Sequence, residues 1–89
     1  MEIQTDKVYV CDTKSFRGFI FKDFKRGGTA YLCQEMKTFC NTAYVNWEGP
    51  NERINIREAS KEQSLWLEEC IKKGIFIPRE QISPNYEIY

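Results

Sequence analysis

Apolar residues recur at helical spacing after Ser60, and this part of the chain carries its clearest pattern. Ser60 and Gln63 have the spacing of a capping box, in which each side chain accepts a hydrogen bond from the other residue's backbone N–H. Gly74 suits the left-handed residue that ends a helix, so the pattern predicts a helix between Ser60 and Gly74. The buried face of this helix is expected to hold four apolar side chains: Trp66, Leu67, Cys70 and Ile71. Residues 75–77 then predict a short strand that stops at Pro78.

Side chains that alternate between two faces with a period of two residues predict four further strands. They are residues 7–12, 18–24, 42–47 and 53–57. The linker between the first two strands is short, so we expect these strands to pair as a hairpin. In the last of the four, Ile54 and Ile56 are expected to face the core while their charged and polar neighbours face solvent.

The segment between Thr29 and Asn41 predicts a second helix. Thr29 can cap its start, and Asn41 suits its left-handed end. Its apolar face would hold five residues at helical spacing: Leu32, Cys33, Met36, Phe39 and Cys40. The element order is then β-β-α-β-β-α-β. Hairpins around two helices indicate an α+β fold with a small, mostly antiparallel sheet, which could curl into a partial barrel.

The length of the chain indicates one domain. We expect its 89 residues to form a single domain over 1–80, with a C-terminal tail over 81–89. A chain this short buries only about 60–65% of its unfolded surface, so its core is small. The chain is 42% hydrophobic and 15% aromatic, which supplies enough apolar material for that core and argues against disorder.

The charges of the chain balance, with 13 basic and 13 acidic residues. This balance excludes a general electrostatic attraction to nucleic acid or to an anionic membrane. The N-terminus lacks the pattern of a secretory signal, and no apolar run approaches the ~20 residues that span a bilayer. We therefore expect a cytoplasmic protein that makes no membrane contact.

The four cysteines are expected to be free, buried thiols: Cys11, Cys33, Cys40 and Cys70. On the expected helix, the Cα atoms of Cys33 and Cys40 would lie about 10 Å apart, which is too far for a disulfide. A reducing cytoplasm also disfavours disulfides. The cysteines lack the short pairwise spacing of structural zinc sites, so we expect no metal.

The chain contains no histidine, which removes the usual general base at neutral pH. A nucleophilic cysteine would need another base or a lowered pKa, whereas three of the four cysteines fall on expected apolar faces. The acidic pairs fall at solvent-facing or helix-terminal positions. We therefore expect neither an enzyme nor a cofactor.

A basic turn is the strongest candidate for a binding site. It comprises Lys22, Lys25, Arg26, Gly27 and Gly28, directly before the expected helix start at Thr29. Free N–H groups at a helix N-terminus favour anions, and the glycines would permit close backbone approach. The alternative is an ordinary connection with solvated charges.

Two sets of aromatic residues are further candidates. Tyr9, Phe19 and Phe21 could stack on single-stranded nucleic acid beside Lys22, although a domain of this size needs aromatic residues in its core. The tail residues Tyr86 and Tyr89 lie outside the expected elements. They suit either docking on their own domain or contact with a partner.

Two stretches resemble known small proteins. The helix that ends in Lys72-Lys73-Gly74 and continues as Ile-Phe-Ile-Pro resembles the C-terminal part of small accessory proteins of large tailed bacteriophages. Residues 31–47 are similar to small SH3-like modules. The resemblance covers about half of the chain. It implies a protein that binds a host protein and inhibits or modulates it.

We therefore expect a small non-enzymatic binding protein with a protein partner. Its contacts would lie at the basic turn and at the tail tyrosines. The alternative is a nucleic-acid-binding module that uses the basic turn and exposed aromatic residues. Homodimerisation is a further option, because a small domain can complete its core across a two-fold axis.

Overall fold

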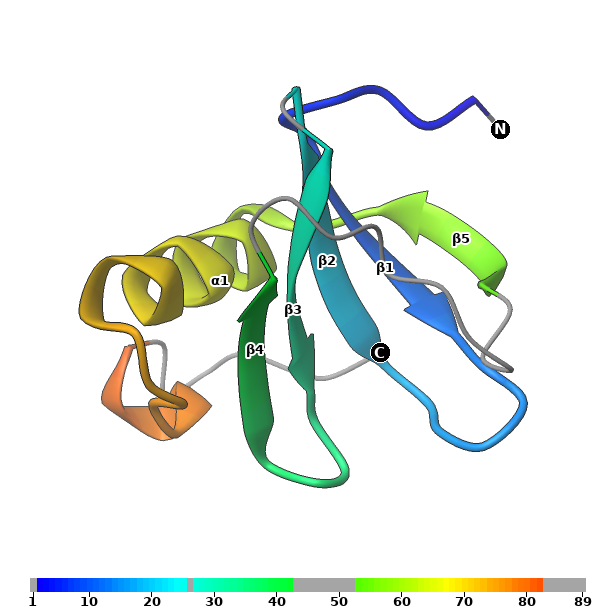
Figure 1. The fold of residues 1–89 in the computed structure, drawn as a ribbon. Coiled ribbons are helices and arrows are strands. Elements are labelled where there is room, and N and C mark those ends of the chain that lie inside the picture. The colour runs from blue at the N-terminus through cyan, green and yellow to red at the C-terminus, as the bar shows by residue number, and fades with distance from the viewer. Residues whose placement is uncertain (1, 26, 43–52, 83–89) are drawn as a thin grey trace.

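Five antiparallel strands form one sheet, and one α-helix packs against a face of that sheet (Figure 1). The computed structural model describes residues 2–25, 27–42 and 53–82. The strands are β1 (Val8–Asp12), β2 (Phe19–Phe24), β3 (Gly28–Cys33), β4 (Thr38–Thr42) and β5 (Ile54–Glu58). The helix α1 (Lys61–Lys73) is followed by the short 3₁₀ helix η1 (Arg79–Gln81). The α+β class with an antiparallel sheet is confirmed.

The strands lie in the order β4-β3-β2-β1-β5. The first four follow one another as hairpins, whereas β5 returns from further along the chain to pair with β1. The sheet is open, because β4 and β5 lie at its opposite ends and do not pair with each other. The described strands therefore do not support the expected curl into a partial barrel.

The expected helix between Thr29 and Asn41 is wrong, because this segment forms the hairpin of β3 and β4. Leu32 pairs with Phe39, so the two apolar residues that helical spacing would place on one helix face instead lie side by side on one sheet face. The connection turns at Lys37, which adopts a left-handed conformation with φ 52°. The expected strand over 42–47 falls on the end of β4 and on residues 43–47, which lie outside the described residues.

The expected hairpin of β1 and β2 is confirmed, with Tyr9 opposite Phe21. Strand β5 is also found where the alternation predicts it. Its side chains differ from expectation, because Ile54 is exposed rather than buried. The pairing of β1 with β5 shifts register between Val10 and Asp12, and Asn55 has a φ of 52°, so the local alternation breaks.

Helix α1 has the expected start and end. Ser60 and Gln63 form the capping box, and Gly74 ends the helix with a φ of 71°. The expected inner face is confirmed: Trp66, Leu67 and Cys70 are buried, and Ile71 is half-buried. The strand expected over 75–77 does not form, because this segment turns away toward η1 without joining the sheet.

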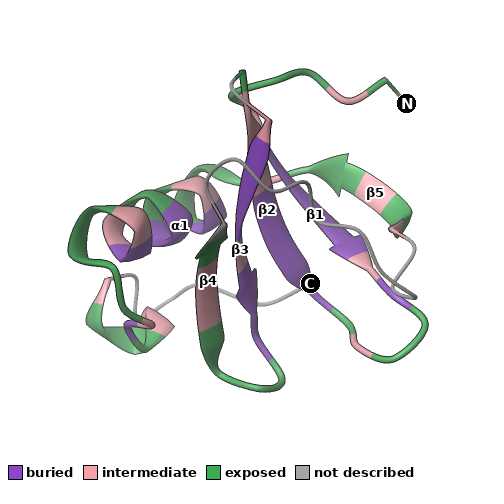
Figure 2. Ribbon diagram, in the orientation of Figure 1, coloured by how far each residue is buried: buried purple, intermediate pink, exposed green. Residues whose placement is uncertain are grey.

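The central strands are buried over much of their length (Figure 2), and apolar side chains lie on both of their faces. The core between the sheet and α1 consists of Val8, Val10, Ile20, Ala30, Leu32, Trp66, Leu67, Cys70 and Ile77. A second cluster on the opposite face consists of Tyr9, Cys11, Phe19, Phe21 and Cys33. The central strands therefore run between two apolar layers, which explains why apolar residues follow one another directly in Val8-Tyr9-Val10-Cys11 and Phe19-Ile20-Phe21.

All four cysteines are free, as expected, and three of them are buried, while Cys40 is half-buried. The argument from the helical separation of Cys33 and Cys40 was wrong, because these residues lie on paired strands rather than on one helix. Neither helix in the described part of the chain is long and apolar enough to cross a membrane.

Candidate functional site

The basic turn connects two strands and does not precede a helix. Gly27 has a φ of 75°, and its N–H donates a 3.0 Å hydrogen bond to the carbonyl of Phe24. Gly28 begins β3 and is buried. The two glycines thus serve a three-residue hairpin loop with a left-handed third residue. The expected helix start at Thr29 is therefore wrong, and the argument that free N–H groups of a helix N-terminus bind an anion here no longer applies.

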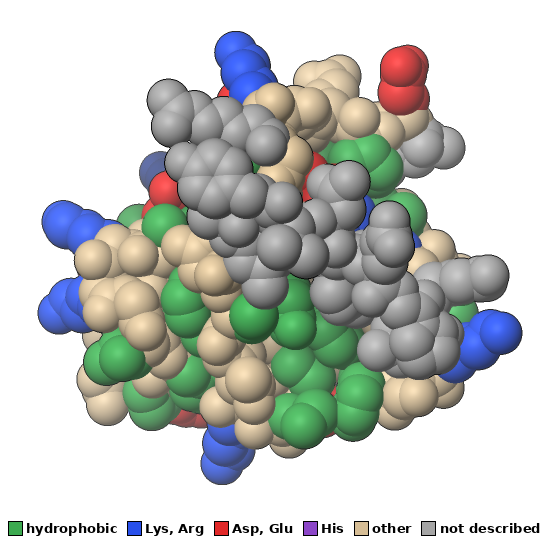
Figure 3. Space-filling model, in the orientation of Figure 1, with side chains coloured by type: hydrophobic (Ala, Val, Ile, Leu, Met, Phe, Trp, Pro, Cys, Tyr) green, Lys and Arg blue, Asp and Glu red, His purple; other side chains and the backbone are tan. Residues whose placement is uncertain are grey.

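The basic residues of this turn lie in different surroundings. Lys22 points toward α1, where its Nζ lies 2.7 Å from Oε1 of Glu68. Lys25 is exposed, and Arg26 lies outside the described residues. On the face in Figure 3, basic side chains lie apart around the outline of the molecule. Lys22 is thus engaged in an ion pair with α1, whereas Lys25 lies exposed beyond the end of β2.

Three aromatic residues were expected either to form part of the core or to stack on nucleic-acid bases, and the structure places them in the core. Tyr9, Phe19 and Phe21 are 3%, 4% and 0% exposed. The rings of Tyr9 and Phe21 stack with their centroids 5.7 Å apart. Because these rings are covered, they offer no free face to a nucleic-acid base.

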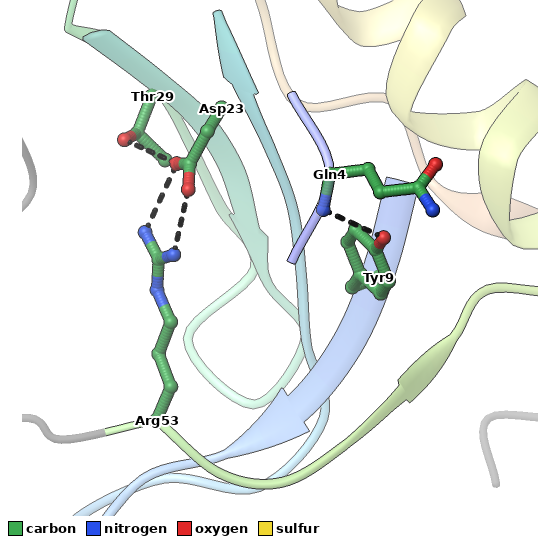
Figure 4. A network of polar contacts seen from close by, with 5 residues as sticks. All are labelled: Gln4, Tyr9, Asp23, Thr29 and Arg53. Carbon is green, nitrogen blue, oxygen red and sulfur yellow. Dashed lines mark hydrogen bonds and ion pairs between the residues drawn. The ribbon is translucent and has the colours of Figure 1, made fainter. Parts of the chain in front are cut away.

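A polar network lies against this aromatic cluster (Figure 4). Arg53 forms two hydrogen bonds of 2.9 and 3.2 Å with the carboxylate of Asp23, which also accepts a 2.8 Å hydrogen bond from the hydroxyl of Thr29. The Arg53 guanidinium lies 4.0 Å from the centre of the Phe21 ring. Nearby, the backbone N–H of Gln4 donates to the Tyr9 hydroxyl at 2.9 Å. The network joins β2 and β3 to Arg53, the residue directly before β5. Its charge-assisted hydrogen bonds hold these segments together as a structural clamp.

A groove of about 300 Å³ lies between α1 and the segment that follows it. Its lining residues are Leu65, Glu69, Lys73, Ile77, Gln81 and Ile82. The apolar part comes from Leu65 on one wall and from Ile77 and Ile82 opposite. Leu65 is 47% exposed, which is unusual for a leucine on a helix whose other apolar residues are buried or half-buried. The charged side chains of Glu69 and Lys73 on α1 also line the groove, so apolar and charged groups lie next to each other in it.

The wall opposite α1 is held by hydrogen bonds to the helix. The indole Nε1 of Trp66 donates to the carbonyl of Ile77 at 2.6 Å, and the N–H of Ile77 donates to Sγ of Cys70 at 3.4 Å. The Phe76 ring packs edge-on against Trp66 at 5.6 Å between centroids. The irregular segment is therefore fixed against the helix, and the groove is a built feature of the fold.

A second pocket, of about 210 Å³, lies on the other side of this segment. Its lining residues are Gln34, Lys37, Trp66, Phe76, Pro78, Arg79 and Glu80. Gln34 is buried, and its Nε2 donates to the carbonyl of Gly18 at 2.8 Å. Its Oε1 is also buried and has no hydrogen-bond partner among the described residues. The amide thus ties the β3–β4 turn to the β1–β2 loop.

Three of the cysteine thiols are poor nucleophiles. Burial raises the pKa of the Cys11 thiol to about 12, and burial also raises the pKa of Cys33 and of Cys70. Within the described ranges, no three acidic or cysteine residues gather in a way that could hold a metal ion. Cys11, Cys33 and Cys70 are members of the two apolar clusters of the core.

The sequence analysis missed the groove and placed binding elsewhere. Tyr86 and Tyr89 lie outside the described residues, and they follow Ile82 closely in the sequence. One signal was available: Leu65 falls outside the apolar stripe of α1, where a leucine has no packing reason of its own. The groove itself depends on the path of residues 75–82, which local pattern does not give.

No protein-family model, curated protein or solved structure matches this chain.

Proposed function

We propose that this chain is a non-enzymatic protein-binding domain whose groove between α1 and η1 receives an apolar side chain of its partner. The observation that supports this is the exposed Leu65 facing Ile77 and Ile82 across a groove of about 300 Å³. Protein interfaces characteristically have an apolar centre and a polar rim. Glu69 and Lys73 supply charged groups next to the apolar residues here.

The dimensions of the groove favour a side chain over a small molecule. Small-molecule sites usually span about 300–1,000 Å³ and enclose most of their ligand. This groove lies at the lower limit and is open along one side, so it fits one apolar anchor from a larger surface. The partner segment would place polar groups beside that anchor, where they meet the carboxylate of Glu69 and the ammonium of Lys73.

The class of partner follows from the resemblance to phage accessory proteins. Under this proposal the partner is a host protein, and occupation of its surface inhibits or modulates it. The tail residues Tyr86 and Tyr89 would extend the contact from the groove. Lys25 and Arg26 at the β2–β3 turn remain candidates for a second contact.

A displayed library of random peptides tests the proposal on the full chain. The protein is treated with nuclease before the selection, so that bound nucleic acid cannot contribute. We expect the selection to enrich peptides with a large apolar residue beside polar ones. Leu65→Glu should weaken their binding by roughly tenfold or more, because a buried anchor contributes more than about 1.4 kcal/mol. Leu65 is half-exposed, so this variant should fold normally.

Met36→Glu is the matched control. Met36 is an exposed apolar residue on the β3–β4 turn and does not line the groove. Its substitution should leave peptide binding unchanged. Equal binding by wild type and Leu65→Glu, or equal loss in both variants, would show that the groove is not the binding site.

A further inference from the structure

The two ends of the sheet are built differently. At one end, the pairing of β5 shifts register, Asn55 takes a left-handed conformation, and Arg57 and Glu58 place charge on the strand. Bulges and charges of this kind protect a sheet edge from pairing with another strand. The β5 end therefore carries the usual protection.

Among the residues that the structure describes, the β4 end lacks that protection. Its five residues, Thr38-Phe39-Cys40-Asn41-Thr42, pair with β3 in an unbroken register from Thr38 to Thr42. The strand contains no charged residue, no proline and no left-handed residue. Within the described part of the chain, no strand pairs with its outer side. Its outer backbone groups are therefore arranged to accept another strand.

We propose that β4 pairs antiparallel with β4 of a second copy of this chain, about a two-fold axis that passes beside Cys40. This symmetry places Thr38 opposite Thr42 of the second copy, Phe39 opposite Asn41, and Cys40 opposite Cys40. A self-paired strand places any charge close to its own copy, and β4 has none. The pairing would join the two sheets into one continuous ten-stranded sheet with both copies of α1 on the same face.

The position of Cys40 makes the pairing observable. Residues directly opposite each other in an antiparallel pair have Cα atoms about 4.5–5.5 Å apart. That separation lies within the range of about 4.4–6.8 Å that a disulfide requires. Cys40 is half-buried, whereas the other three cysteines are buried, so its thiol is the accessible one.

Sedimentation of the reduced full chain over micromolar to millimolar concentrations is the first test. We expect a monomer–dimer equilibrium. Cys40→Asp should raise the dissociation constant by more than tenfold, because it places two carboxylates opposite each other across the axis. Cys40→Ser should leave the equilibrium nearly unchanged. A wild-type monomer at every concentration, or equal dimerisation of both variants, would overturn the proposal.

Oxidation with diamide is the second test. Diamide accepts the two electrons and two protons that are released when two Cys40 thiols join as a disulfide. We expect rapid formation of a covalent dimer that is lost in Cys40→Ser. The control is Arg57→Cys combined with Cys40→Ser, which presents an exposed thiol on β5 instead. Equally rapid cross-linking of this control would indicate random collision and contradict the pairing. The Leu65→Glu variant should still form the dimer, because Leu65 lies in the groove and not on β4. Dimerisation and peptide binding are therefore tested independently.

Discussion

The indole of Trp66 and the backbone carbonyl of Ile77 are joined by a buried hydrogen bond of 2.6 Å. The N–H of the same Ile77 donates to the thiol of Cys70. Two helix side chains thus satisfy both backbone groups of a residue that belongs to no strand. This is how an irregular segment can be buried, since an unpaired backbone group inside a protein costs free energy.

The first prediction concerns this contact. Trp66→Phe keeps an aromatic ring but leaves the carbonyl of Ile77 without its donor. We expect the free energy of unfolding to fall by about 1–3 kcal/mol in urea titrations. The amide of Ile77 should also exchange hydrogen faster. Leu65→Ala on the same helix is the control and should change stability by less than about 0.5 kcal/mol, because Leu65 is half-exposed. Wild-type stability in Trp66→Phe would contradict this assignment.

The second prediction concerns the ion pair of Arg53 and Asp23. Asp23→Asn retains an acceptor for Thr29 but removes the charge that Arg53 binds with two hydrogen bonds. We expect a loss of about 1–2 kcal/mol in unfolding free energy, since both side chains are mostly shielded from solvent. Glu58→Gln, which removes the exposed ion pair with Lys7, should have little effect. A larger effect from Glu58→Gln would mean that the clamp contributes less than its geometry indicates.

The third prediction concerns the end of α1. Gly74 has a φ of 71°, and a Cβ atom added there would meet nothing within 4 Å. Gly74→Ala should therefore destabilise through backbone strain alone, by about 1 kcal/mol. Gly74→Asn should cost less, because asparagine tolerates the left-handed conformation. Thermal unfolding of the three proteins gives the ranking, and an alanine variant as stable as wild type would argue against the cap.

The fourth prediction concerns pH. Burial raises the pKa of Cys11 from 9.0 in the unfolded chain to about 12 in the folded protein. Below pH 9 the thiol is protonated in both states, so its contribution to stability is constant. Above that pH the unfolded chain loses the proton while the folded protein keeps it. Stability should therefore fall as the pH rises from about 9 toward 12.

Cys11→Ala provides the comparison for this pH dependence. Lysines and tyrosines titrate in the same interval, and they do so in both proteins. The difference in unfolding free energy between wild type and variant should shrink as the pH rises through this interval. A difference that stays constant would show that the Cys11 thiol does not remain protonated in the folded state.

Local pattern predicted much of this fold because several elements carry their own signals. The capping box of Ser60 and Gln63 and the left-handed Gly74 bound α1 without reference to the rest of the chain. The alternation in β1 and β2 is equally local, and the short linker between them predicted the hairpin in which Tyr9 lies opposite Phe21.

The β3–β4 hairpin could not be predicted in the same way. Leu32, Met36 and Phe39 satisfy helical spacing, and the turn between the strands contains no glycine, proline or asparagine. Lys37 takes the left-handed position there, and side chains of this type rarely do so. In the hairpin, Leu32 and Phe39 lie opposite each other on paired strands. The same spacing of seven residues also fits one face of a helix, so spacing alone does not distinguish the two structures.

The candidate binding surfaces depended still more on tertiary structure. The sequence places Lys22 close to the basic turn, whereas in the structure Lys22 pairs with Glu68 of α1. The groove arises because Ile77 packs back on Trp66, so it has no continuous motif in the sequence. The signal in the sequence was the position of Leu65 outside the apolar stripe of α1.

The arrangement of strands also bears on the order in which the chain folds. Strands β1 to β4 each pair with their neighbour in sequence, so their hairpins close short loops with a small entropy cost. Pairing of β5 with β1 and docking of α1 on β2 and β3 close much longer loops. We expect the meander over residues 8–42 to form in the folding transition state and the C-terminal half to dock later. Until α1 docks, Ile20 and Leu32 are exposed to solvent because the helix side chains that bury them are not in place. A nascent chain at this stage is therefore prone to aggregation.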